Sequence, residues 1–91
     1  MKTERQKILK KVKEIVIQHL DVENPESVNE SSRLKEDLGG DSLDGIEVAI
    51  ALDKQFYINT SDEDITRINE GTVSDIADIV VEHLNKKEAR K

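Results

Sequence analysis

Leu38-Gly39-Gly40-Asp41-Ser42-Leu43 is the point in this chain where a long polar loop gives way to an amphipathic helix. We expect that helix to run from about Ser42 to Phe56. Two glycines let the backbone turn tightly before it. Asp41 is a good N-cap, and Asp44 completes an acidic first turn. Ser42 then opens the helix with its hydroxyl toward solvent, where a phosphate ester would meet unpaired backbone N–H groups and the positive end of the helix dipole.

The segment before the loop is expected to form a first helix. Thr3 and Gln6 make a capping-box pattern at its start. Its apolar residues recur at helical spacing and form one stripe, which consists of Ile8, Val12, Ile15, Val16 and Leu20. The loop that follows covers residues 21–36, and we expect Val28 and Leu34 to pin it to the core.

The central helix is expected to bury one face and to expose a face rich in carboxylates. The inward face is expected to consist of Ile46, Ala49, Ile50, Leu52 and Phe56, with Val48 near its edge. Asp44, Glu47 and Asp53 are expected to face outward, near Ser42. An acidic face beside an exposed hydroxyl favours a docking role over a merely solvated surface.

Two more helices are expected after the central one. Ser61 and Asp64 resemble a cap and its third residue, and they open a short helix that runs to about Ile68. Thr72 with Asp75 starts the last helix, whose apolar stripe consists of Val73, Ile76, Ala77, Val80 and Leu84. With no strand-like alternation, the expected fold is all-α: a small four-helix bundle of three main helices and a short third one. Residues 1–84 are expected to form the domain, and residues 85–91 a charged tail that frays.

Charge is unevenly distributed along the chain, whose net charge is −6. Residues 1–20 carry six basic and two acidic residues, a net of +4, and residues 85–91 carry a net of +3. Residues 21–84 carry seventeen acidic and four basic residues, a net of −13. Such an acidic body repels nucleic acid and anionic membranes, and it attracts basic protein surfaces. A helix-turn-helix regulator is disfavoured for the same reason, because it needs a basic recognition helix.

The composition also argues against several kinds of site. The chain contains no cysteine, so it has no disulfide, thiolate nucleophile or cysteine metal site. No histidine cluster suggests a transition metal. The spacing of Asp62, Glu63 and Asp64 is not that of an EF-hand loop, although such a cluster attracts divalent cations loosely. The N-terminal segment has no apolar run long enough for a signal peptide or a membrane span, so we expect a cytoplasmic protein with no metal site.

The motif around Ser42, at the head of the second helix of a short acidic chain, resembles the attachment site of acyl and peptidyl carrier proteins. The resemblance runs from the first helix to about Leu84. It implies that Ser42, within the triplet Asp41-Ser42-Leu43, carries a 4′-phosphopantetheine arm that a phosphopantetheinyl transferase adds from coenzyme A. Acyl intermediates would ride on the arm as thioesters. The chain itself would then be a carrier and not an enzyme.

The same resemblance implies roles for residues of the other helices. Asp44, Glu47 and Asp53 would face partner enzymes with basic docking surfaces, namely the transferase and acyl-transferring or synthase enzymes. An acyl chain would enter a crevice lined by Ile46, Ala49, Ile50, Leu52, Ile65, Ile68 and Ile76. The implied function is that of a monomeric carrier in fatty-acid or specialised lipid or polyketide biosynthesis. Gly39-Gly40 leans toward peptidyl carriers, so an aminoacyl or peptidyl cargo stays open as an alternative.

Two other interpretations compete with the carrier. Gly40-Asp41-Ser42-Leu43 also spells the signature of the GDSL hydrolases, in which Ser42 would be a nucleophile that needs a positioned base. Neither His19 nor His83 has an aspartate three residues before it, and we expect both to lie at helix C-termini, where a cation is favoured. The chain is also too short for that α/β fold. An acidic helical interaction module with an unmodified Ser42 remains the second alternative.

Overall fold

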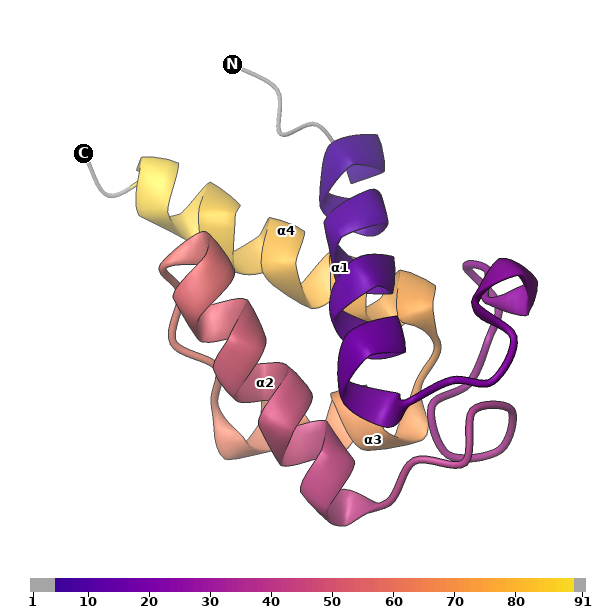
Figure 1. The fold of residues 1–91 in the computed structure, drawn as a ribbon. Helices are drawn as coiled ribbons and strands as arrows, with labels where there is room; N and C mark the ends of the chain where they lie inside the picture. Colours follow the sequence, from indigo (N-terminus) through magenta and orange to yellow (C-terminus); the bar gives the residue numbers. More distant parts are fainter. Residues whose placement is uncertain (1–4, 90–91) are drawn as a thin grey trace.

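Four α-helices and one short 3-10 helix make up the part of the chain that the structure describes (Figure 1). The computed structural model describes the backbone of residues 5–89 and the side chains of residues 5–86. In chain order the elements are α1 (Arg5–Leu20), η1 (Pro25–Ser27), α2 (Ser42–Phe56), α3 (Asp62–Glu70) and α4 (Val73–Ala89). Three longer helices and a short α3 confirm the predicted bundle. The capping pattern predicted at Thr3 lies outside the described residues.

The core lies where the helices meet, and α4 touches each of the other three (Figure 1). The apolar stripes predicted for α1 and α4 are buried, except that Leu20 and Leu84 at their ends are half-buried. Leu9 and Ile79 are buried too, although the predicted stripes left them out. Because α4 packs against three neighbours, more of its surface is covered than one stripe.

The loop between α1 and α2 is tied to the junction between α3 and α4. Val28 and Leu34 are buried, as predicted. The amides of Val73 and Ser74 donate to the carbonyl oxygens of Ser32 and Glu30 at 3.0 and 2.9 Å. The loop therefore arrives at α2 along a defined path, on the side of the molecule to the right of α1 in Figure 1.

Two glycines complete that path, each for a different reason. Gly39 has φ +72°, a left-handed conformation that favours glycine. Gly40 donates its amide to the carbonyl oxygen of Leu34 at 2.7 Å. A Cβ on Gly40 would lie 3.0 Å from Leu20 Cδ2 and 3.1 Å from that oxygen, so a side chain there would require these neighbours to move by a few tenths of an ångström. The turn predicted from the sequence is confirmed.

The orientation predicted for α2 is wrong for three residues. Val48, placed near the edge, is fully buried, whereas Ile46 and Ile50 are 41% and 49% exposed. The buried face of α2 consists of Gly45, Val48, Ala49 and Leu52. Gly45 decides which face of α2 is buried, because a Cβ at this position would collide with the side-chain amide of Asn69 on α3. The helix turns its smallest residue toward α3, and Ile46 and Ile50 are thereby directed outward.

The C-terminal half begins as predicted and ends later. Ser61 and Asp64 form a capping box at the start of α3, which ends at Glu70, two residues beyond the prediction. α4 continues to Ala89, so the stretch from residue 85, which was expected to fray, is helical up to that point. Residues 90–91 of the predicted tail lie outside the described chain. Within the described part, no helix is long and apolar enough to cross a membrane.

Candidate functional site

The first turn of α2 presents Ser42 to solvent. Asp41 is the N-cap: its Oδ1 accepts from the amide of Asp44 at 3.0 Å, and the amide of Asp41 donates to Asp44 Oδ2 at 2.9 Å. Ser42 is the first residue of the helix and is exposed, as predicted, and Leu43 beside it is 61% exposed. The Ser42 hydroxyl therefore stands where the first backbone N–H groups of a helix have no intrahelical partner.

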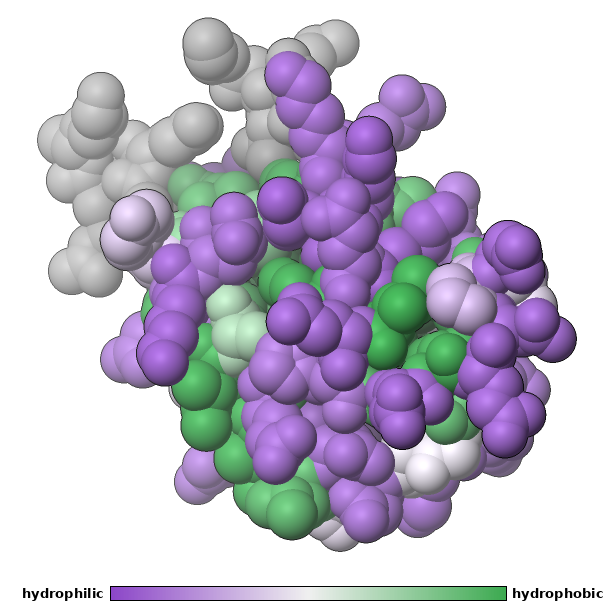
Figure 2. All heavy atoms as spheres, in the orientation of Figure 1, coloured by the Kyte–Doolittle hydropathy of each residue, from purple (hydrophilic) through white to green (hydrophobic). Residues whose placement is uncertain are grey.

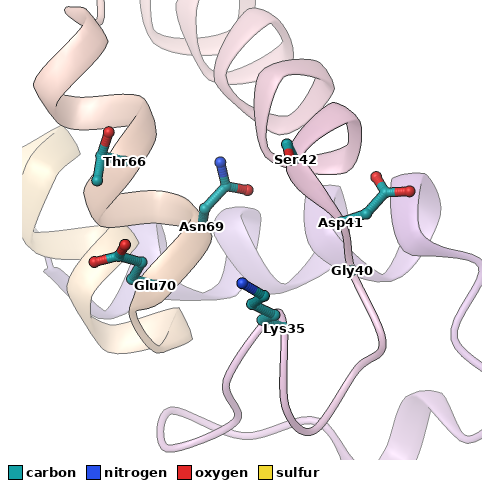
Figure 3. A pocket seen from close by; sticks show the side chains of 7 residues that line it. All are labelled: Lys35, Gly40, Asp41, Ser42, Thr66, Asn69 and Glu70. Carbon is teal, nitrogen blue, oxygen red and sulfur yellow. The ribbon is translucent and has the colours of Figure 1, made fainter.

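A cavity of about 200 Å³ opens beside this hydroxyl (Figure 3). The start of α2 forms one wall, the last two turns of α3 form the opposite wall, and the loop before Gly40 closes the bottom. Its lining residues are Lys35, Gly40, Asp41, Ser42, Thr66, Asn69 and Glu70. Thr66, Asn69 and Glu70 were not among the predicted site residues, because only the packing of α3 against α2 brings them to Ser42, and Lys35 was not predicted because the path of the loop brings it there.

Two of the three carboxylates predicted to face partners also make structural hydrogen bonds. Asp44 is half-buried and closes the capping box of α2. Asp53 is half-buried as well, and it accepts from the amide and the hydroxyl of Thr60 at 3.0 and 3.4 Å, which fastens the turn after α2. Glu47 is exposed and makes no hydrogen bond or ion pair to another described residue. The face is acidic as predicted, but only Glu47 is free of a structural bond.

An apolar band runs along the outer side of α2. It consists of Leu43, Ile46 and Ile50, which are 61%, 41% and 49% exposed. Figure 2 shows hydrophobic residues along the outer edge of α2, at the lower left, whereas hydrophilic residues cover α1 in front. The spacing of three and four residues was the available signal, since it marks one face of a helix. Ile46 and Ile50 were wrongly predicted to face inward to an acyl crevice.

The other five residues predicted for the acyl crevice lie between helices. Ala49, Leu52, Ile68 and Ile76 are buried, and Ile65 is half-buried against the same core. They come from α2, α3 and α4, so parting α3 from its neighbours would expose an apolar surface.

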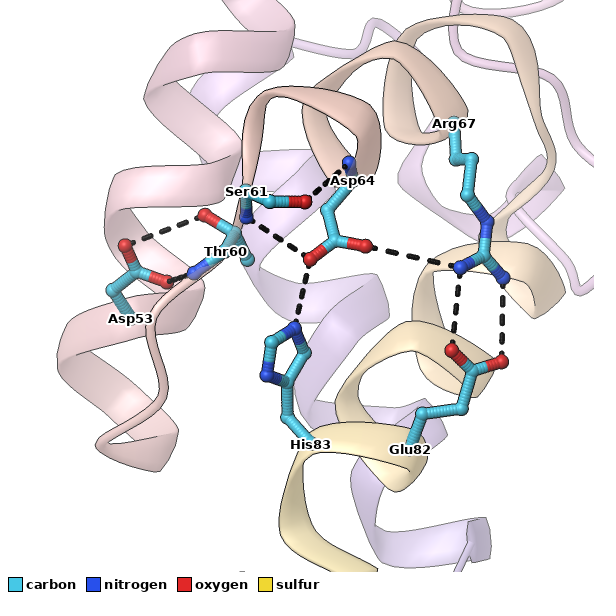
Figure 4. A network of polar contacts seen from close by, with 7 residues as sticks. All are labelled: Asp53, Thr60, Ser61, Asp64, Arg67, Glu82 and His83. Carbon is cyan, nitrogen blue, oxygen red and sulfur yellow. Dashed lines mark hydrogen bonds and ion pairs between the residues drawn. The ribbon is translucent and has the colours of Figure 1, made fainter. Parts of the chain in front are cut away.

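Polar contacts join α3 to α4 across this core (Figure 4). His83 Nε2 lies 2.8 Å from Asp64 Oδ2, which also accepts from the amide of Ser61 at 3.0 Å. Burial acts to raise the pKa of Asp64, but the hydrogen bonds from Ser61 and His83 outweigh it and lower the pKa below its ordinary value. Arg67 pairs with Glu82 nearer the surface at 3.2 Å.

One prediction about these residues is wrong. His83 does not lie at a helix C-terminus, because α4 continues to Ala89 and His83 faces Asp64. Asp64 is buried and bonded to Ser61 and His83, so its carboxylate is not exposed beside those of Asp62 and Glu63. In the described chain no group of three or more histidine, cysteine or acidic side chains is placed to hold a metal ion.

Several known proteins resemble this chain over most of its length. Residues 10–80 match the family model described as Phosphopantetheine attachment site. An acyl carrier protein of Wolinella succinogenes is 46% identical over 65 residues, which are 71% of this chain and 82% of the relative. One of Zymomonas mobilis is 40% identical over 73 residues, 80% and 90% of the two chains. The solved structure of an acyl carrier protein from Enterococcus faecalis has a TM-score of 0.70 at 32% identity and covers 89% of this chain and 99% of that one.

The match to the family model runs from α1 into α4 and includes the loop and the whole of α2. Members of this family are carriers and not enzymes: they bear 4′-phosphopantetheine covalently and are substrates of a phosphopantetheinyl transferase. Both the predicted cofactor and the predicted carrier role are confirmed. The chain belongs to the family of phosphopantetheine-bearing acyl carrier proteins.

Proposed function

We propose that Ser42 is the residue to which the arm is attached. The observation that carries the proposal is the exposed Ser42 hydroxyl, which opens α2 beside a cavity within the matched residues 10–80. The group fits there: the hydroxyl is unobstructed, and helix N-termini favour phosphate. In the transfer, Ser42 Oγ bonds to the phosphorus of the pantetheine half of coenzyme A. The diphosphate P–O bond breaks, adenosine 3′,5′-bisphosphate leaves, and the hydroxyl proton is released. The bound arm supplies a thiol that carries the acyl group as a thioester.

Intact-mass spectrometry after incubation with coenzyme A and a broad-range transferase tests the attachment. Wild type should gain one arm, and Ser42→Ala should gain none. Ser31→Ala is the matched control, because Ser31 is exposed in the loop and its hydroxyl makes no bond to another described residue. Ser42→Ala should still fold, since Asp41 caps α2 with or without the hydroxyl. An adduct on Ser42→Ala would overturn the proposal, and so would wild type that stays unmodified with several transferases.

We also propose that partners dock on the outer face of α2. Glu47 is a free carboxylate between the exposed Ile46 and Ile50, so a basic surface with an apolar patch would match this face. Asp44 and Asp53 add negative charge there while they keep their structural bonds. The partners would be the transferase and acyl-transferring or synthase enzymes.

The cargo that we propose is an acyl chain of fatty-acid or specialised lipid or polyketide biosynthesis. The apolar surface of Leu52, Ile68 and Ile76 between α2, α3 and α4 suits such a chain, and the relatives are named acyl carrier proteins. We further propose that residues 1–84 act as the carrier domain, as a monomer in the cytoplasm. Comparing the thermal stability of the arm-bearing protein with and without an acyl chain tests the cargo. An aminoacyl chain, which would stay in solvent, should leave the stability unchanged.

A further inference from the structure

The cavity beside Ser42 contains a lysine that makes no ion pair in the described chain. Residues 21–84 hold only four basic side chains against seventeen acidic ones. Arg33 pairs with Glu36, and Arg67 pairs with Glu82. Lys35 lines the cavity and has no hydrogen bond or ion pair to another described residue. A free positive charge thus lies close to the exposed hydroxyl in a body that is otherwise strongly negative.

The opposite wall of the cavity is polar and is held in place by helix packing. Asn69 lies against Gly45, where any Cβ would collide with its amide, so the approach of α2 to α3 fixes where Asn69 stands. In Figure 3, Asn69 points from α3 toward α2, Lys35 rises from the loop into the gap, and Glu70 points away from Ser42. Thr66 stands one turn before Glu70 on the same wall.

The groups of 4′-phosphopantetheine match the side chains that line the cavity in chemical kind. A phosphodiester with one negative charge comes first, attached to the serine oxygen, and a hydroxyl and an amide follow it. Lys35 offers an ammonium group to the phosphate, and the free N–H groups of the first turn of α2 add positive potential. Asn69 offers both an amide donor and an amide acceptor to the next part of the arm. Asp41 is already engaged in the helix cap.

We infer that this cavity is a docking site for the first half of the arm, with Lys35 as the counter-ion of its phosphate and Asn69 as the partner of its first amide. The inference rests on the proposed attachment at Ser42. Lys35 and Asn69 are here positioning residues: they give the arm a preferred direction, from α2 across to α3, and hold it back from free rotation about the Ser42 side chain. Because Lys35 is exposed, the pair is screened by water. The docked-to-free ratio then depends on Lys35 by roughly two- to fivefold, which is the range of one exposed ion pair.

Isotope-filtered nuclear magnetic resonance tests the docking site on the arm-bearing protein. Protein labelled with ¹³C and ¹⁵N is modified with unlabelled coenzyme A, so that contacts between arm and protein are detected selectively. Wild type should show nuclear Overhauser effects from the arm's geminal methyl groups to Thr66 and to the Asn69 amide. The docked-to-free ratio, followed by ³¹P relaxation, should fall roughly two- to fivefold in Lys35→Gln. Lys54→Gln is the matched control, since Lys54 is exposed and makes no ion pair in the described chain.

The measurement separates failure of the docking site from failure of the attachment. The docking site alone is overturned if the protein gains the mass of the arm, the arm makes no contact with α3, and ³¹P relaxation is equal in wild type, Lys35→Gln and Lys54→Gln. A wild type without any mass increase overturns the attachment and the docking site with it. Asn69→Ala provides a second test. If this variant is modified as fully as wild type but loses the contacts between the pantetheine arm and α3, the docking site is supported even where Lys35→Gln is modified slowly. Contacts that persist unweakened in Asn69→Ala and Lys35→Gln together overturn the assigned roles.

Discussion

The Asp64–His83 hydrogen bond and the Arg67–Glu82 ion pair, which join α3 to α4, should differ in energy, although they lie side by side (Figure 4). The side chains of Asp64 and His83 are 12% and 23% exposed, and their atoms lie 2.8 Å apart. The side chains of Arg67 and Glu82 are 46% and 54% exposed at 3.2 Å. A hydrogen bond to a charged group that is shielded from water contributes about 1.5–3 kcal/mol. An exposed ion pair contributes only about 0–1 kcal/mol.

Double-mutant cycles measured by urea unfolding test this difference. One cycle uses Asp64→Ala and His83→Ala, and the other uses Arg67→Ala and Glu82→Ala. We expect a coupling free energy of about 1.5–3 kcal/mol for the buried pair and at most about 1 kcal/mol for the exposed pair. Asp64→Ala alone should cost about 2–4 kcal/mol, because it also removes the acceptor of the Ser61 amide at the start of α3. Equal couplings in the two cycles would refute the reasoning that burial decides the strength of these contacts.

Four further outcomes are expected. Glu47→Lys should slow modification by the transferase on the order of fivefold, whereas Glu63→Lys, the same charge change on α3, should not; equal rates in a transferase assay would exclude the outer face of α2 as the docking surface. A medium-length acyl chain should raise the melting temperature of the arm-bearing protein, and Ile76→Phe should shrink that rise, because it fills the space between helices. Sodium chloride at about 0.1 M should raise the melting temperature measured by circular dichroism, because it damps repulsion among residues 21–84, whose net charge is −13. A neutral osmolyte is the control. A melting temperature that is flat or falls with salt would mean that the charges are balanced in the fold. Acid should destabilise the fold through Asp64, because folding lowers the pKa of its carboxyl group. The stabilisation is therefore present above the ordinary carboxyl range and is lost as the pH falls from about 5 through that lowered pKa. Asp64→Asn should flatten this part of an acid-unfolding curve.

Local signals in the sequence were enough to predict the starts of three helices. The side chains of Asp41 and Ser61 each accept a hydrogen bond from the backbone amide three residues further on. Thr72 makes the same bond with the amide of Asp75 at the start of α4. The position of Ser42 follows from its cap, so the centre of the candidate site was predictable. Hydrogen bonds of this kind form with the nearest backbone, and tertiary packing changes them little.

The orientation of α2 and the far wall of the cavity depend on contacts that are distant in sequence. Val48, Ile46 and Ile50 are all apolar, so periodicity alone could not decide which of them faces the core. The contact of Gly45 with Asn69 decides it, across 24 residues of chain. His83 and Asp64 likewise meet only after α3 has packed on α4. Lys35 enters the site through the loop, whose path depends on bonds to the start of α4.

The contacts that hold α3 in place bear on how fast this helix opens relative to the rest of the bundle. α3 has nine residues, which is too short for a helix to persist alone in water, and only Asp64 and Ile68 of it are buried. It stays folded through contacts made at its two ends: the Ser61 cap and His83 at one, and the Arg33 guanidinium on the Glu70 carbonyl oxygen at the other. Such a segment opens as a unit at a free energy well below that of global unfolding. Amide hydrogens of α3 should then exchange with solvent sooner than those of α1 and α4, and we expect cargo to enter at the pace of this local opening while the rest of the bundle stays closed.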